Sequence, residues 1–226
     1  MKIAVIGHSM VHVRQQNYFK QFAKLTNSDV LLLSPVSWGE QKAVKEKVQE
    51  ATWGYELAPL PYMGYSQWTF ILVGMTTYLD TFKPNILYVQ EEPGSSIASR
   101  ASAYADEHKI PLVLFTWENL NSPNPIAQEN LKHCALVICG NQEAVPLVAP
   151  YAKKTFVQLQ VGVDTVHFWQ RDVERNIKVA FIGRNIEEKG VDILRIAYPA
   201  AKILPWKPWL ELPWWYSQCQ IVVSFS

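Results

Sequence analysis

The stretch that decides the fold is "VAFIGRNIEEKGVDIL", residues 179–194. A β-branched apolar run ends in Gly183, a short polar step follows, and a second apolar pattern begins after Gly190. This order predicts a buried strand, a sharp turn and a helix. Asn185 with Glu188 three residues later forms a capping-box pattern, which predicts that the helix begins there.

Two cations, Arg184 and Lys189, flank this turn. Free backbone N–H groups at a helix start, together with the helix dipole, favour an anion. A guanidinium and an ammonium at the same strand-to-helix turn would add to that attraction, and a diphosphate fits this chemistry. The alternative is a well-capped turn whose cations are only solvated.

The same alternation of strand and helix continues outward from this turn. It predicts a mostly parallel α/β sheet with helices on both faces. We expect strands at 2–8, 29–35, 55–61, 85–93, 112–119, 135–140, 155–164 and 178–184, and helices at 13–25, 66–82, 95–108, 126–133 and, interrupted, 141–152. The charged stretch 39–51 is expected at the surface.

Polar residues follow two of these strands, and ligands of such sheets lie beyond the carboxyl ends of the strands. Glu91 and Glu92 could accept hydrogen bonds from substrate hydroxyls, or one of them could be a general base. The alternative is that the pair caps the helix that begins near Ser95. The amide-rich segment that contains Glu118 and Asn119 suits sugar binding or simple turn formation.

Two motifs together give a family resemblance: "GVDTVHF" (162–168) and, after a short step, "GRNIEEKGVDIL" (183–194). The pair resembles the family-four retaining glycosyltransferases of GT-B fold. The segments "KIAVIGH" (2–8), "KPNILYVQEEPGS" (83–95) and "VLFTWENL" (113–120) are similar to the corresponding parts of that family. The resemblance implies an N-terminal Rossmann-like parallel sheet and a second Rossmann-like domain.

The resemblance also implies roles for individual residues. The donor diphosphate would be held by Arg184, Lys189, Gly183 and Gly7. Members often carry a histidine where this chain has Trp117. From their places after strands, the candidate catalytic carboxylates are Glu91 and Glu118. The acceptor would be bound by His8, Glu92, Trp117 and Asn119.

The expected domains are an acceptor-side domain (1–165), a linker (166–177) and a truncated donor domain (178–226). Truncation is expected because "LPWWYSQCQIVVSFS" (212–226) follows the 179–194 stretch almost directly and the family's acidic–glycine motif is absent. The implied activity is transfer of a sugar from a nucleotide-diphosphate-sugar to an acceptor hydroxyl with retention. The alternative is a non-catalytic, glycosyltransferase-like protein that binds a sugar, a nucleotide or a partner subunit.

The composition of the chain limits the other functional classes. Lys+Arg of 21 against Asp+Glu of 20 gives a net charge of +1, which disfavours nucleic acid as a partner. His8 and His12 are not accompanied by further metal ligands, so no metal site is expected. No cofactor is expected, because the nucleotide-sugar is a co-substrate. The expected acceptor is a carbohydrate or a lipid-linked molecule.

Three cysteines without CxxC spacing suggest a reduced, cytoplasmic protein. The apolar stretch 68–79 is too short to span a bilayer. The tryptophan-rich segment 203–216 leaves two alternatives open, peripheral membrane contact or internal packing. Self-association is expected from an open sheet edge.

Overall fold

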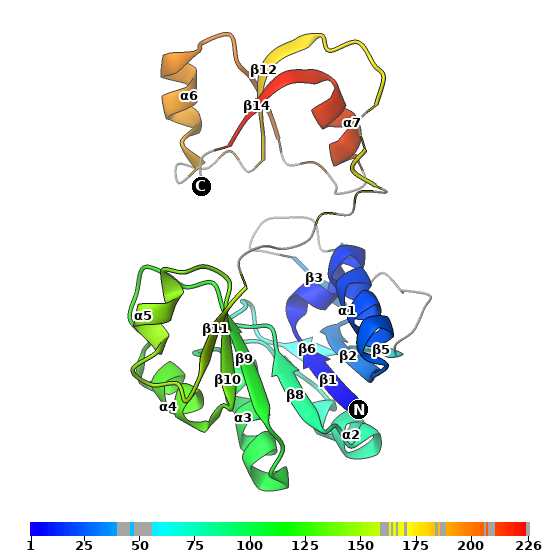
Figure 1. The fold of residues 1–226 in the computed structure, drawn as a ribbon, viewed down its shortest axis with the longest axis vertical. Helices are drawn as coiled ribbons and strands as arrows, with labels where there is room; N and C mark the ends of the chain where they lie inside the picture. Colours follow the sequence, from blue (N-terminus) through cyan, green and yellow to red (C-terminus); the bar gives the residue numbers. More distant parts are fainter. Residues whose placement is uncertain are drawn as a thin grey trace. The chain divides into compact units, whose positions relative to one another are not determined.

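The structure is a computed structural model that divides into two compact units, Met1–Gln160 and Val161–Ser226, here the N-terminal and C-terminal units (Figure 1). It describes residues 1–39, 46–47, 56–158, 163, 165, 167–169, 171–183, 185, 189–205, 207 and 211–224. Most of the expected surface stretch 39–51 lies outside these residues.

The N-terminal unit is built on a seven-stranded, all-parallel sheet in the order β11-β10-β9-β8-β1-β2-β5. Its strands are β1 (Lys2–Ile6), β2 (Asp29–Pro35), β5 (Glu56–Leu60), β8 (Ile86–Val89), β9 (Leu112–Thr116), β10 (Leu136–Cys139) and β11 (Thr155–Val157). Two small antiparallel pairs accompany the sheet: β3 (Ser37–Trp38) with β4 (Glu46–Lys47), and β6 (Tyr62–Met63) with β7 (Ile71–Leu72). The predicted parallel α/β sheet is therefore confirmed.

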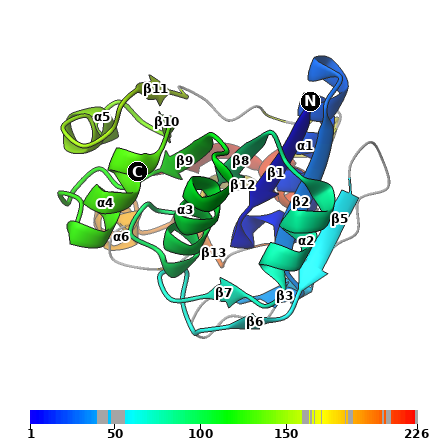
Figure 2. The same cartoon turned by 90° about the horizontal axis from the view of Figure 1, so that it is seen from below.

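Helices cover both faces of this sheet (Figure 2). They are the 3-10 helix η1 (His8–Val11) and the α-helices α1 (Val13–Thr26), α2 (Met75–Phe82), α3 (Ser96–His108), α4 (Pro125–His133) and α5 (Ala144–Val148). Alternate residues of β1 show the division, because Ala4 and Ile6 join one buried cluster and Ile3 and Val5 another. The first cluster packs against α2 to α5 and the second against α1.

The C-terminal unit has a three-stranded parallel sheet in the order β13-β12-β14. Its elements are β12 (Ile177–Ile182), α6 (Val191–Ala197), β13 (Lys202–Leu204), α7 (Leu212–Ser217) and β14 (Cys219–Val223). Two small apolar clusters lie on its two faces, one around Ala180 and the other around Phe181. The small second sheet has the parallel βαβ form expected of a Rossmann-like domain.

The tryptophan-rich segment divides between core and surface. Trp215 of α7 packs against the cluster around Ala180 and lies 4.4 Å below the Lys207 Nζ, measured to the ring centroid. Trp214 next to it is 45% exposed. Internal packing therefore accounts for Trp215, whereas Trp206 and Trp209 lie outside the described residues.

The prediction of one helix over 66–82 is wrong. Residues 71–72 form β7, and α2 begins only at Met75, after Gly74 with φ +84°. The left-handed backbone of Gly74 separates the hairpin from the helix. The expectation that Asn185 caps the helix of the decisive stretch is also wrong, because Gly190 is the N-cap of α6.

Each helix in the described part of the chain is too short or too polar to cross a membrane.

Candidate functional site

The candidate site lies at the carboxyl ends of β1 and β8, which are neighbours in the sheet. From β1 the chain continues to β2 on one side, whereas β8 is followed by β9 on the other side. This reversal is the topological switch point, where open parallel sheets bind their ligands. Gly7 and His8 follow β1, and Glu91 and Glu92 follow β8, so the two predicted groups are brought together.

His8 and Glu91 form the central pair of this site. The backbone N–H of His8 donates to Glu91 Oε1, and His8 Nδ1 lies 2.6 Å from the same oxygen. Glu91 is only 5% exposed, whereas the His8 side chain is 19% exposed. An ionised carboxylate only accepts, so a neutral His8 ring in this contact would carry its proton on Nδ1 and leave the Nε2 lone pair for a ligand.

Gly7 lets the end of β1 approach the loop after β8. A Cβ placed on this buried glycine would lie 3.2 Å from the Gln90 carbonyl oxygen and 3.4 Å from Glu91 Oε1. A side chain here would push against the carboxylate that holds His8.

Two aromatic side chains fix the His8 ring. The Trp38 ring centroid lies 4.7 Å from that of His8 at an interplanar angle of 35°, and Phe70 meets the same ring edge-on at 6.1 Å. Phe70 is fully buried and Trp38 is 8% exposed, so both are parts of the core. The imidazole therefore has little room to leave its position beside Glu91.

Glu92 is turned toward β9. It accepts a hydrogen bond from the Thr116 hydroxyl, and its Oε1 lies 2.8 Å from the backbone nitrogen of Trp117. Burial raises the pKa of Glu92, and these two hydrogen bonds partly offset the effect. In this structure Glu92 thus fixes the start of the loop that carries Trp117.

The Trp117 ring packs against Gly140, the residue that directly follows β10. A Cβ on Gly140, directly after β10, would come 2.3 Å from the Trp117 ring, so only glycine leaves room for the indole. Asn141 Nδ2 also donates to the Trp117 carbonyl at 3.0 Å. The ring remains 49% exposed and offers a flat apolar surface next to Glu92.

Glu118 is engaged by its own turn. Its Oε1 accepts from the backbone N–H groups of Leu120 (2.9 Å) and Asn121 (3.0 Å). These backbone donors lower the pKa of Glu118 and hold it as a carboxylate. Asn119 is exposed in the same turn.

The alternative that Glu91 and Glu92 cap the following helix is not what the structure shows. Ser95 is the N-cap of α3, and its hydroxyl oxygen accepts from the Ala98 N–H at 3.2 Å. Both glutamate side chains are instead turned toward β1 and β9.

The predicted diphosphate turn lies in the C-terminal unit. Gly183 follows β12 directly, and its N–H donates to the Leu204 carbonyl at 3.3 Å. Lys189 is half-buried and stands just before Gly190, the left-handed N-cap of α6. Arg184 lies outside the described residues. Within the described part of the chain, no group of three His, Cys, Asp or Glu side chains could hold a metal ion.

Several contributors to the site were missed from the sequence, among them Trp38, Phe70, Thr116 and Gly140. Gly140 carried a usable signal as a glycine at a strand end. The other three carried none, because their partners lie far away in the chain.

Comparisons with known proteins agree with this architecture. No protein-family model and no curated protein matches the chain. Among solved structures, Anabaena Alr3699/HepE in complex with UDP superimposes with a TM-score of 0.61 at 14% identity, over 98% of this chain and 73% of that one.

Two further structures have lower similarity. Phytolacca americana UGT2, complexed with UDP-2fluoro-glucose and pterostilbene, gives a TM-score of 0.51 at 10% identity, over 92% of this chain and 72% of that one. A putative UDP-N-acetylglucosamine 2-epimerase from Listeria monocytogenes gives a TM-score of 0.50 at 11% identity. The superposition covers 100% of this chain and 69% of that one. The chain thus has the α/β fold of GT-B type, with a Rossmann-like parallel sheet in each of its two units.

Proposed function

We propose that the protein transfers a sugar from a nucleotide-diphosphate-sugar to an acceptor hydroxyl. The observation that carries the proposal is the His8–Glu91 pair at the switch point of a GT-B type fold. Support for the nucleotide-sugar comes from HepE and UGT2, whose structures contain UDP or a UDP-sugar analogue. The resemblance of the 162–168 and 183–194 motifs to family-four glycosyltransferases points the same way.

In this proposal His8 receives the acceptor. Its Nε2 accepts a hydrogen bond from the reacting hydroxyl, and in an inverting transfer it also takes the proton as the glycosidic bond forms. Glu91 acts through the ring, since its Oε1 fixes Nδ1–H and stabilises the imidazolium that results. Glu91 is therefore a positioning residue, and direct contact with substrate is left to His8.

The acceptor we propose is a carbohydrate or a lipid-linked carbohydrate. Trp117 offers an exposed aromatic face for a sugar ring, and Asn119 offers an exposed amide in the following turn. Glu118 is held ionised by backbone donors and can accept a hydrogen bond from an acceptor hydroxyl. Glu92 acts indirectly by fixing the Trp117 loop.

The leaving diphosphate is assigned to the turn of the C-terminal unit. Negative charge grows on this group as the donor bond breaks, and fixed cations stabilise it most at that moment. Lys189 and, on sequence grounds, Arg184 supply this charge, and Gly183 leaves the backbone open beside β12.

The stereochemical outcome defines what His8 does. The resemblance supports retention at the anomeric carbon. A base that activates the acceptor for direct displacement gives inversion instead, by the geometry known from glycoside hydrolysis. Proton NMR of the product gives the configuration of the new glycosidic bond. An inverted configuration would identify His8 as the base, and a retained configuration would leave His8 with acceptor binding alone.

The proposal is tested by incubating the protein with a panel of nucleotide-sugars and acceptor saccharides and measuring both donor hydrolysis and transfer. We expect His8→Asn and Lys189→Gln each to lower kcat/KM by about a hundredfold, the range typical for loss of a base or of a transition-state charge partner. Lys178→Gln, an exposed lysine on β12, is the matched control. Donor binding without turnover would support the non-catalytic alternative and overturn the enzyme proposal.

A further inference from the structure

The C-terminal unit contains a cavity that the proposed function does not use. Its volume is about 350 Å³. The described residues that line it come from the segment before β12 and from α7: Phe168, Trp169, Arg171, Arg175, Pro213, Tyr216 and Ser217. This volume is at the small end of the range for ligand-binding pockets.

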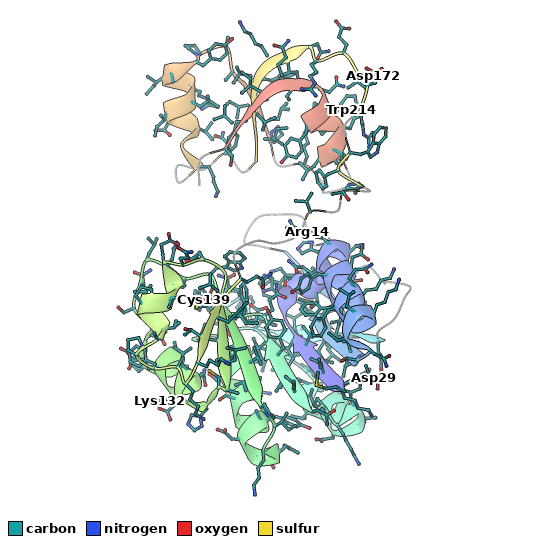
Figure 3. All side chains as sticks on the ribbon, in the orientation of Figure 1. Arg14, Asp29, Lys132, Cys139, Asp172 and Trp214 are labelled. Carbon is teal, nitrogen blue, oxygen red and sulfur yellow. The ribbon has the colours of Figure 1, made fainter. Side chains whose placement is uncertain are left out.

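The cavity lies at the amino-terminal edge of the small sheet. Ile177, the first residue of β12, pairs with Cys219, the first residue of β14, and the lining residues precede these two positions. Figure 3 labels Asp172 and Trp214 at this end of the unit, beside α7. Gly183 follows the other end of β12, about 20 Å away for a strand of this length. The cavity is therefore separate from the diphosphate turn.

Among the described residues that line the cavity, the charge is positive and unbalanced. Arg171 Nε is buried and has no hydrogen-bond partner among the described residues. In that part of the chain no ion pair joins Arg171 or Arg175 to a carboxylate, and the neighbouring Asp172 and Glu174 are exposed and do not line the cavity. A buried N–H of a charged group without an acceptor is costly, and a bound oxyanion would remove that cost.

The walls of the cavity are aromatic. The Arg171 guanidinium lies over the Trp169 ring, 5.5 Å from its centroid, which holds the cation in place from one side. Phe168 and Tyr216 form another part of the lining, with ring centroids 6.2 Å apart. Such surfaces pack against a flat or ring-shaped body with exposed C–H groups.

We propose that this cavity binds a phosphate monoester carried on a ring, either an aryl or a sugar ring. Two guanidinium groups match the charge of a phosphate monoester, about −1.5 to −2 near neutral pH. The Nε edge of a guanidinium also fits two oxyanion oxygens side by side. The phosphate could belong to a free small molecule or to a lipid headgroup, and the experiment separates these sources.

The test uses the full chain and isothermal calorimetry with phenyl phosphate and glucose 6-phosphate as probes. Phenol and glucose are the matched uncharged compounds. We expect saturable binding of at least one phosphate ester and none of its uncharged counterpart. Arg171→Gln should weaken that binding at least about tenfold, the loss expected for a charge-assisted pair, and circular dichroism would verify that the variant is folded.

Two control variants make the result specific. Arg195→Gln removes an exposed arginine of α6 in the same unit and should leave the affinity within about twofold, as for a surface charge outside the site. Lys189→Gln removes the cation of the diphosphate turn. If Lys189→Gln weakens phosphate-ester binding and Arg171→Gln does not, the ester binds at the turn and the cavity proposal is overturned.

Vesicles distinguish the source of the phosphate. Pelleting with vesicles that contain phosphatidylinositol 4-phosphate, whose headgroup is a phosphate monoester on a ring, but not with phosphatidylcholine vesicles, lost in Arg171→Gln, would assign the site to an anionic lipid headgroup. Absence of binding to every anionic probe, or equal affinities of Arg171→Gln and the unaltered chain, would overturn the proposal. None of these readouts depends on sugar transfer, so they stand or fall separately from the proposed enzyme activity.

Discussion

At the scale of single residues, the site depends on close approaches that leave room for only one side chain. Trp117 and Gly140 show this best, because the indole occupies the space that a Cβ on Gly140 would need. The indole in turn stands beside the backbone N–H that binds Glu92. A change at Gly140 should therefore be felt at the acceptor side of the site without touching any proposed substrate ligand.

We predict that Gly140→Ala lowers the free energy of unfolding by about 1–3 kcal/mol, because the added methyl group overpacks against the Trp117 ring. Urea denaturation followed by circular dichroism measures the change. In the double variant Gly140→Ala/Trp117→Ala the methyl group has room, so the cost of Gly140→Ala should largely disappear. An equal cost in both backgrounds would show that the indole is not the obstacle.

The raised pKa of Glu92 leads us to predict how the stability of the folded protein depends on pH. Burial raises its pKa above the ordinary value of 4.5, so the folded protein binds this proton more tightly than the unfolded chain. The resulting contribution to stability is complete below pH 4.5 and is lost as the pH rises through the higher folded-state value. Glu92→Gln keeps an acceptor for Thr116 and Trp117, and should remove this loss from urea-denaturation curves measured between about pH 4 and pH 7.

Glu118 serves as a control, because its pKa shift, and with it the pH dependence of stability, has the opposite sign. Backbone donors lower its pKa, so its contribution is present above the ordinary value and is lost as the pH falls through the lower folded-state value. Glu118→Gln should therefore flatten the acid side of the stability profile and leave the region above pH 4.5 unchanged. The assignment of Glu92 fails if Glu92→Gln and the unaltered protein lose stability in parallel above pH 4.5.

The residues of the site could be predicted from the sequence more readily than the hydrogen bonds between them. Parallel strands bring their carboxyl ends to one edge, so polar residues after β1, β8 and β9 could be grouped from periodicity alone. That Glu91 turns to His8 and Glu92 to Thr116 depends on side-chain directions across strands distant in the chain. No local pattern encodes that choice.

At the scale of elements, the segment 62–82 shows where periodicity fails. Apolar residues continue through it, yet its first half is the β6–β7 hairpin and only its second half is helical. The difference is made by Gly74, whose φ of +84° ends the hairpin and begins α2. The long helices α1 and α3 were predicted correctly because their buried faces repeat at helical spacing over several turns.

Gly74→Ala should cost about 1 kcal/mol, because alanine adopts the left-handed region poorly. A Cβ at Gly74 meets no atom within 4 Å, so this cost is one of backbone conformation and not of packing. Gly74→Asn should cost less, since asparagine tolerates this region better. Thermal unfolding of the two variants measures the order, and an asparagine variant less stable than the alanine variant would contradict the interpretation.

At the scale of the whole molecule, the two units have cores of very different size. The N-terminal unit buries one continuous cluster across six of its seven sheet strands and the helices α2 to α5, with a second cluster beneath α1. The C-terminal unit has only two small clusters, one of which contains Phe181, Val191 and Leu194. Buried apolar area sets most of the stability of a unit, so the two should differ in resistance to denaturant.

We predict two unfolding transitions in urea, the first belonging to the C-terminal unit. Leu194→Ala should shift only the first transition and Leu87→Ala only the second, each by about 2–5 kcal/mol for a buried leucine. Tryptophan fluorescence follows the first transition well, because five of the nine tryptophans lie after residue 160. A single transition shifted by both variants would show that the units unfold together.

The place of β1 in the middle of its sheet has a consequence for the newly made chain. Its first neighbour, β2, leaves the ribosome soon afterwards, but the other neighbour, β8, is more than 80 residues downstream. At a translation rate of about 5–20 residues per second, one edge of this largely buried strand waits some 4–16 seconds for its partner. The nascent protein therefore passes through a stage in which chaperone capture competes with aggregation, and codon choice between β2 and β8 should influence how much soluble product is obtained.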